Sequence, residues 1–148
     1  MSGTGEPGYV DGPSSVAQFN EPQGLCVDMF RNVYVADTLN HRIRRVDTSG
    51  FVTTIAGTGE TGQLNGGFAD GDALTEARFS SPTGISLYYD WSETGNGELV
   101  IIVADTNNHR IRKIVGGVVT TLAGGERGYR DGYGFSGSHP TLSLSQCC

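Results

Sequence analysis

The chain has 148 residues, 23 of them glycine, and a formal net charge of −6 at pH 7. This length suits one ordinary domain, and the negative charge argues against binding to nucleic acid through phosphates, which needs clustered positive charge. The three cysteines (Cys26, Cys147 and Cys148) form neither an even disulfide framework nor a zinc-binding spacing. The sequence shows no signal peptide and no apolar run of membrane-spanning length, and it leaves the compartment open.

In chain order, the first predicted feature is a glycine-rich opening that recurs. It begins at residues 3–12, returns at 57–71, and starts a third time at 124–132. Each opening contains an Asp-Gly pair, and the first two lead to an Ala-x-Phe-x-x-Pro-x-Gly phrase. The span from 58 to 83 is long for a structureless loop in a compact domain. Because its landmarks repeat, the sequence predicts a shaped connection between units.

Four strands are expected after each opening, because short runs of β-branched and aromatic residues alternate with Gly, Asn and Asp turns. Residues 33–47 return as residues 101–115 with nine of the fifteen residues identical, which indicates one supersecondary unit used twice. The expected strands are 24–28, 32–37, 41–47 and 51–56 in the first copy, and 84–89, 98–105, 109–115 and 118–123 in the second. Asn40 and Asn108 lie between strands, where asparagine tolerates a positive φ angle.

Two features stand out from the shared pattern. Basic residues alternate with apolar ones in the third strand of each copy, which predicts a solvated strand face rather than a nucleic-acid contact. The second copy is longer by an insertion at 89–97, which extends the hairpin between its first two strands and places Trp91 at an exposed loop tip. An exposed tryptophan can anchor a partner, whereas a long hairpin can also fold its aromatic side chain onto its own stem.

Together, the Tyr/Ile-x-Val-Ala-Asp strand, the Asn-His-Arg-Ile-Arg turn and the closing Thr-Thr-x-Ala-Gly phrase resemble the NHL repeat. The resemblance covers about residues 3 to 132. It implies four-stranded blades of a β-propeller, usually six-bladed in this family, that serve as a rigid platform for macromolecular partners. A minority of related propellers are metal-dependent lyases or lactonases.

The predicted fold class is therefore all-β: a partial β-propeller of two four-stranded antiparallel blades with long Gly-rich connections. Repeats occupy 1–132, with blade one at about 24–57, blade two at about 84–124, and connections at 3–23, 58–83 and 125–132. The tail 133–148 lacks the repeat pattern and is expected to be disordered. Because blades need neighbours to bury their faces, we interpret the chain as a fragment or truncated product of a larger propeller. The alternative is a homotrimer that completes a six-bladed ring.

Several patterns with chemical potential have simpler structural explanations. The spacings Gly3-x-Gly5-x-x-Gly8 and Gly57-x-Gly59-x-x-Gly62 match a dinucleotide fingerprint, but no helix follows to hold a pyrophosphate. The recurring histidines and carboxylates fit turns and backbone or arginine contacts better than metal binding or acid–base catalysis. The residues interpreted as a structural repeat motif are Asp37, Asn40, His41, Arg42, Asp105, Asn108, His109 and Arg110.

The sequence favours a non-catalytic scaffold or interaction module. No catalytic, cofactor-binding or metal-binding residue is assigned, and no cofactor is expected. The competing interpretation is part of a metal-dependent lyase or lactonase-like enzyme, inactive as this chain alone because its ligands would come from other blades. We expect a protein partner rather than nucleic acid, with contacts at the turns and the insertion: Trp91, Asn40, Asn108, Arg42 and Arg110.

Overall fold

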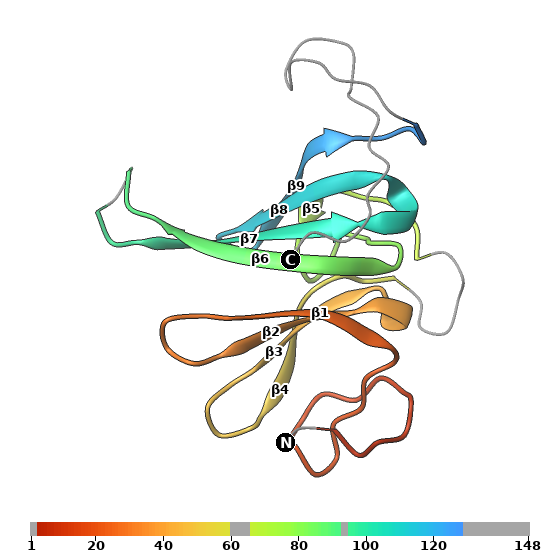
Figure 1. Cartoon of the computed structure of the whole chain (residues 1–148), viewed down its shortest axis with the longest axis vertical. Helices are drawn as coiled ribbons and strands as arrows, with labels where there is room; N and C mark the ends of the chain where they lie inside the picture. Colours follow the sequence, from red (N-terminus) through yellow and green to blue (C-terminus); the bar gives the residue numbers. More distant parts are fainter. Residues whose placement is uncertain (1–2, 60–65, 93–94, 129–148) are drawn as a thin grey trace.

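The computed structural model describes residues 3–59, 66–92 and 95–128 and contains two antiparallel sheets (Figure 1). In the first sheet the strands lie in chain order: β1 (Pro22–Val27), β2 (Val33–Asp37), β3 (Arg42–Val46) and β4 (Val52–Ala56). The second sheet has the order β5-β9-β8-β7-β6, with β5 (Gly71–Asp72), β6 (Pro82–Asp90), β7 (Glu98–Asp105), β8 (Arg110–Val115) and β9 (Val118–Gly124). The strands follow the predicted ranges closely, and the all-β partial propeller is confirmed. The predicted tail 133–148 lies outside the described residues.

The turn between the second and third strands of each sheet is a short 3-10 helix. The first is η1 (Thr38–Asn40) and the second is η2 (Thr106–Asn108). The residue that takes the left-handed conformation is the histidine that follows, with φ of 55° at His41 and 53° at His109. The prediction that asparagine supplies the positive φ angle is therefore wrong. Asn40 stays in the 3-10 turn because its side chain is held by hydrogen bonds, and the left-handed step moves to the next residue.

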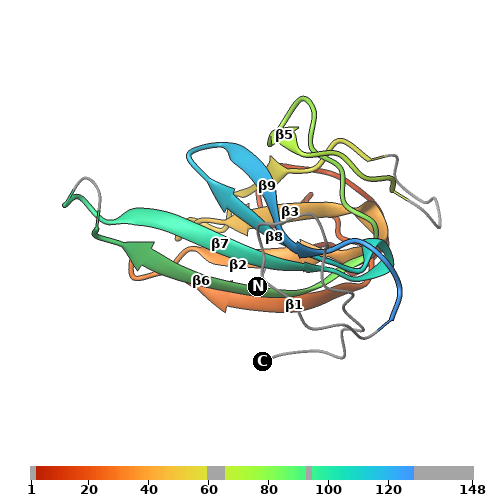
Figure 2. The ribbon, with the colours of Figure 1, turned by 90° about the horizontal axis from the view of Figure 1, so that it is seen from above.

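The two sheets pack face to face, and β1 runs beside β6 (Figure 2). We call them the first and second blades. Alternation gives each blade a front face and a back face. The front face carries Leu25, Val27, Val33, Val35 and Val46 in the first blade and Ile85, Leu87, Ile101, Val103 and Ile114 at the matching positions of the second. The back face carries Cys26, Tyr34, Ala36 and Ile43 in the first blade and Ile102, Ala104 and Ile111 in the second.

The hydrophobic core lies where the back face of the first blade meets the front face of the second. Tyr34, Ala36 and Ile43 are buried there against Ile101 and Val103. Burial of these side chains is the main stabilising contribution available to a chain this short. The front face of the first blade and the back face of the second are covered by no other blade in the described part of the chain.

The connections follow the outer edge of the blade that comes after them. Gly12 forms a bridge with Val52, and β5 pairs with β9 at the equivalent place. The backbone amide of Thr4 donates to the carbonyl of Ala17, and that of Thr58 donates to Ala77. Each connection is thus folded back on itself in the same way.

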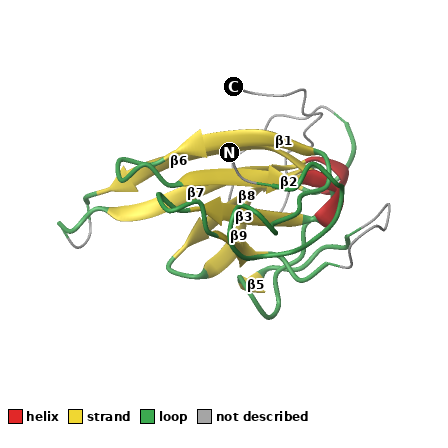
Figure 3. Cartoon of the chain, turned by 90° about the horizontal axis from the view of Figure 1, so that it is seen from below, coloured by secondary structure: helices red, strands yellow, loops and turns green. Residues whose placement is uncertain are grey.

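Hairpins and 3-10 turns lie at opposite ends of the blades (Figure 3). The β1–β2 hairpin closes at one end through residues 28–32, and the described residues 91–92 and 95–97 of the β6–β7 hairpin lie at the same end. We call this end the hairpin rim. At the other end lie η1, η2 and the connections, which we call the connection rim.

Gly24 sets how closely the blades approach. A Cβ atom at this position would collide with the carbonyl oxygen of Thr83, which belongs to the backbone of β6. A backbone carbonyl, unlike a side chain, cannot change rotamer to avoid the new methyl group. Gly24→Ala is therefore expected to separate β1 from β6 and to lower the free energy of unfolding by roughly 1–3 kcal/mol. Urea denaturation followed by circular dichroism measures the loss. The exposed neighbour serves as control: Gln23→Ala should unfold at the wild-type midpoint, and equal loss in both variants would contradict the account.

Candidate functional site

One buried arginine anchors each blade. Arg44 on β3 donates to Asp37 over 2.6 Å and pairs with Asp11 over 2.7 Å. Its remaining hydrogens go to the carbonyl oxygens of Gln18 and Val10. The guanidinium thus joins β2, β3 and the preceding connection in one network, with every contact charge-assisted.

The second blade repeats the network with the equivalent residues. Arg112 donates to Asp105 over 2.6 Å and pairs with Asp70 over 2.7 Å. Carbonyl oxygens of Arg78 and Ala69 take the remaining hydrogens. Because the same geometry is present in both blades, it serves the architecture rather than one chemical step.

The prediction of a solvated basic face is wrong for these two arginines, since both are 0% exposed. The alternation of apolar and basic residues looked like a half-exposed strand. In the fold the connection covers that face, and aromatic rings cover the cation. Arg44 lies 4.9 Å from the ring centroids of Tyr9 and of Phe19, and Arg42 lies 4.1 Å from Tyr9. Arg110 stacks on Phe68 in the same way, at 3.8 Å.

The carboxylates at the ends of β2 and β7 each accept several donors. Asp37 receives the backbone amide of Asn20 and the side-chain amide of Asn40, both over 2.8 Å, as well as Arg44. Burial raises the pKa of Asp37 and of Asp105, and the asparagine, backbone and arginine donors oppose that rise. The charged state of these carboxyl groups therefore depends on an intact network.

The aspartates of the Asp-Gly pairs tie the connections to the outer strand. Asp11 accepts the backbone amide of Thr54 over 2.9 Å, and Asp70 accepts that of Thr121 over 3.1 Å. Each of these carboxylates is bound by an arginine and a backbone amide of its own blade, so its role is to hold the connection against the sheet. Asp131, the third of the series, lies outside the described residues.

Asn40 and His41 are buried at the junction between blades, with exposed fractions of 1% and 0%. Asn40 donates to the carbonyl of Gly8 over 2.8 Å, and Nδ1 of His41 accepts the backbone amide of Ser81 over 2.9 Å. The expectation that Asn40 is exposed to a partner is therefore wrong. The equivalents in the second blade, Asn108 and His109, are only half-buried, and no further blade covers them among the residues that the structure describes.

The described part of the chain contains no group of three or more His, Cys, Asp or Glu side chains able to hold a metal ion. It also contains no helix long and apolar enough to cross a membrane. The glycines of 3–8 lie in a connection where the amide of Gly8 donates to the carbonyl of Phe19. This backbone contact turns the loop inward, and no helix N-terminus follows it.

The hairpin rim carries exposed aromatic side chains from both blades. Phe30, in the β1–β2 hairpin, is 66% exposed, and Trp91, in the β6–β7 hairpin, is 57% exposed. Tyr89 lies between them, with its ring centroid 6.4 Å from Phe30 and 6.5 Å from Trp91. Met29 adds an exposed side chain beside Phe30. We call Met29, Phe30, Tyr89 and Trp91 the rim cluster.

Sequence reasoning found Trp91 but missed Phe30. The two residues are far apart in the chain, and only blade packing brings their hairpins together. The aromatic ring of Trp91 also lies against Gly97, where an added Cβ would collide with it. Trp91 thus packs partly on its own hairpin while more than half of its surface faces solvent.

A buried carboxylate fixes the first hairpin. Asp28 accepts the backbone amides of Phe30 and Asn32 over 2.8 Å each, the Asn32 side chain over 2.7 Å, and the Tyr34 hydroxyl over 3.2 Å. Burial alone would raise the pKa of Asp28, but these hydrogen bonds outweigh it and hold the pKa below its usual value. The hairpin that presents Phe30 is therefore rigid when Asp28 is ionised.

Asp28→Asn is expected to lower the free energy of unfolding at pH 7 by about 1–3 kcal/mol, because amide donors lose their charged acceptor. A lowered native pKa contributes stability above the unfolded value of about 3.9, and this contribution is lost as pH falls through the native pKa. The gap between wild type and variant should therefore shrink between pH 5 and pH 2. Urea denaturation at a series of pH values tests this, and a gap that widens on acidification would contradict it.

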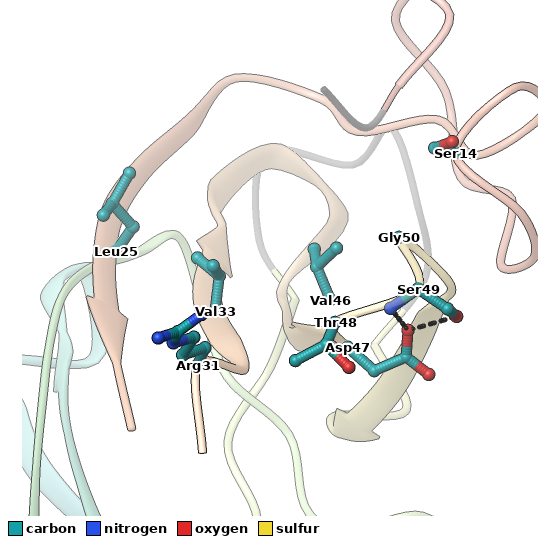
Figure 4. A pocket seen from close by; sticks show the side chains of 9 residues that line it. All are labelled: Ser14, Leu25, Arg31, Val33, Val46, Asp47, Thr48, Ser49 and Gly50. Carbon is teal, nitrogen blue, oxygen red and sulfur yellow. Dashed lines mark hydrogen bonds between the residues drawn. The ribbon is translucent and has the colours of Figure 1, made fainter. Parts of the chain in front are cut away.

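The front face of the first blade is hollowed into an open groove of about 810 Å³ (Figure 4). Leu25, Val33 and Val46 line its floor, while the turn 47–50 and Ser14 form its far side. In that turn Asp47 accepts the amide and the hydroxyl of Ser49. A second groove of about 580 Å³ lies at the connection rim, between residues 3–7 and 19–22.

Comparison with known proteins shows which sequences the chain resembles. The sequence profile of the NHL repeat matches residues 19–46. The chain is 40% identical over 107 residues to NHL repeat-containing protein 2 from Homo sapiens, covering 71% of this chain and 13% of that protein. It is 32% identical to Protein SUPPRESSOR OF QUENCHING 1, chloroplastic, from Arabidopsis thaliana, over 99% of this chain and 13% of that protein.

Solved structures show the same fold. A putative phosphatase from Bacteroides thetaiotaomicron matches with a TM-score of 0.59 and 27% identity, over 82% of this chain and 26% of that chain. An auxiliary nutrient binding protein from Bacteroides ovatus also gives 0.59 and 27%, over 78% and 26%. The chain thus spans about an eighth of these curated relatives and about a quarter of these solved chains.

Proposed function

The chain belongs to the NHL-repeat β-propeller family, and from that premise we propose that it is a non-catalytic interaction module whose rim cluster binds a protein partner. The observation that carries the proposal is the gathering of Phe30, Tyr89 and Trp91 from two blades on one solvent-facing edge. Isolated exposed apolar residues are ordinary on protein surfaces. Adjacent aromatic rings held in place are typical of interaction hot spots.

Rigidity supports the same proposal. Asp28 fixes the hairpin of Phe30, and the stem of β6 and β7 carries Trp91 beyond the end of the sheet. A partner therefore meets a preformed surface and loses little free energy in ordering it. The rim cluster combines flat rings with the flexible Met29, a composition that suits an apolar protein segment.

We also propose that these blades act within a larger propeller. The front face of the first blade exposes Leu25 and Val27, although their equivalents Ile85 and Leu87 pack against the core. An apolar face that is covered in one repeat and open in the other requires another blade beside it.

Site-specific cross-linking tests the partner site. A photoactivatable residue replaces Trp91 in the full chain, and the same residue replaces Leu74, an exposed position in a connection, as the control. After irradiation in a lysate of cells that make the chain, cross-linked proteins are identified by mass spectrometry. We expect one protein to cross-link from position 91 and to be lost when Phe30→Ala is added. An identical set from position 74, or cross-linked nucleic acid in place of protein, would overturn the proposal.

Once that partner is purified, substitution measures the contribution of the ring. Trp91→Ala is expected to weaken binding at least tenfold, because truncating a central aromatic anchor removes about 2 kcal/mol or more. Arg31→Ala, an exposed change in the neighbouring hairpin, is the control. Titration calorimetry with the full chain gives both affinities. Equal affinities for wild type and Trp91→Ala would show that the partner binds elsewhere.

A further inference from the structure

The junction between the blades is a template for a second, identical junction. Two hydrogen bonds define it at the connection rim. The backbone amide of Ser81 donates to Nδ1 of His41 over 2.9 Å, and the Thr38 hydroxyl donates to the carbonyl of Pro82 over 2.7 Å. Gly66 lies so close to the His41 ring that a Cβ atom would collide with it. The connection of the second blade thus forms a seat for the 3-10 turn and histidine of the first.

The first blade carries the same seat, and the structure shows it open. Glu21 has a φ angle of 50°, as Ser81 has 49°, and Pro22 follows it as Pro82 follows Ser81. The groove of about 580 Å³ lies here, formed by residues 3–7 and 19–22. In the repeat, Gly3 to Gly5 are the equivalents of Gly57 to Gly59, and Gly59 lies against the His41 side chain at the internal junction.

The second blade carries the matching projection. Its 3-10 turn, η2, begins at Thr106, the equivalent of Thr38, and ends before His109, the equivalent of His41. His109 has the same left-handed backbone, with φ of 53°, and is half-exposed where His41 is buried. The seat and the projection are therefore present at opposite ends of one chain.

The apolar faces beside them match as well. The front face of the first blade exposes Leu25 (66%) above the groove lined by Val33 and Val46. The back face of the second blade leaves Ile111 half-exposed and Leu122 exposed, whereas their equivalents Ile43 and Ile55 pack in the core. The internal junction is made by a back face on a front face, and these two surfaces are of those same kinds.

We propose that the seat of the first blade receives the Thr106–His109 turn of a second copy of this chain, with Ile111 and Leu122 of that copy covering Leu25. The amide of Glu21 donates to Nδ1 of His109, and the hydroxyl of Thr106 donates to the carbonyl of Pro22. The contact is head-to-tail, so repetition generates a closed ring when the rotation between copies closes. This inference is independent of the rim cluster, which lies at the other end of the blades.

A mixing experiment with two blocked chains tests the proposal. Leu25→Arg places a charge on the exposed front face and leaves the back face intact. Leu122→Arg does the reverse. Light scattering after gel filtration gives the mass of each full-length protein, and circular dichroism shows that each is folded. We expect wild type to form one discrete oligomer and each variant alone to be monomeric. An equimolar mixture should give a one-to-one pair, because each chain keeps one working surface.

The results of these measurements distinguish what covers the open faces of the two blades. A wild-type chain that stays monomeric at millimolar concentration overturns the proposal and leaves the open faces to blades of another kind. A second result is a wild-type oligomer that is dissociated by Leu25→Arg and unaffected by Leu122→Arg. That result would overturn the proposal in favour of a symmetric front-to-front dimer. His109→Ala supplies an independent readout: it should weaken the wild-type assembly at least tenfold. Ser92→Ala, a change at an exposed position of the β6–β7 hairpin at the other rim, should leave assembly unchanged.

Discussion

Arg44→Met is expected to lower the free energy of unfolding by roughly 3–5 kcal/mol, a loss comparable with the whole stability of a small domain. Methionine fills the space of the side-chain stem but leaves Asp37 buried without its cation. The carbonyl oxygens of Gln18 and Val10 lose their donors in the same step. The penalty comes from these stranded groups more than from the lost attraction itself.

Two matched variants sharpen this prediction. Arg112→Met should cost a similar amount, because its partners Asp105 and Asp70 have the same geometry. Arg42→Met should cost under about 1 kcal/mol, since Arg42 is half-exposed and stacks on the exposed Tyr9. Urea denaturation measures all three changes. If Arg44→Met and Arg42→Met were equally mild, the buried network would not hold the blade together.

His41→Ala is expected to lower the free energy of unfolding by about 2–4 kcal/mol, and the equivalent His109→Ala to lower that of the dilute chain by less than 1 kcal/mol. The imidazole of His41 fills the space between the blades and accepts the amide of Ser81. Alanine leaves a cavity and a buried amide without its acceptor. His109 has the same backbone and the same neighbours in sequence, so the difference isolates the effect of a covering blade.

The comparison uses thermal and urea denaturation at neutral pH and a protein concentration at which the chain is monomeric. A near-zero effect at position 41 would mean that the blades are not packed as described. Equal losses at both positions would mean that the histidine acts within its own blade. A loss at position 41 alone supports the junction, and it also predicts that His109 becomes sensitive once a further blade covers it.

The strands and the repeat could be predicted from sequence, because a period-two pattern and recurring turn residues report local structure directly. The strand that ends at Asp37 and the one that ends at Asp105 are examples. The burial of the Arg44 side chain could not be predicted from sequence. Alternation shows that the two faces of a strand differ, but it does not show which part of the chain covers each face. In this fold the connection supplies the cover, carrying Tyr9 and Phe19 against the guanidinium.

The rim cluster shows a second limit. Trp91 could be singled out from the sequence because it is the one tryptophan of the chain and lies in an insertion. Phe30 has no local sequence feature that distinguishes it from a core residue. Their proximity depends on how the blades pack, which sequence periodicity does not encode. Asn40 and Asn108 likewise occupy the same place in the repeat and make equivalent hydrogen bonds, yet Asn40 is buried and Asn108 is half-buried.

Hydrogen exchange of two connection amides tests the packed pair of blades most directly. The amide of Ser80 donates to Asp105 over 2.7 Å and that of Ser81 donates to His41 over 2.9 Å, although neither residue belongs to a strand. We predict that both exchange as slowly as the amides of β7 when followed by NMR. Exchange of Ser81 at the rate of an unstructured peptide would show that the second blade does not rest on His41, and the described junction would be wrong.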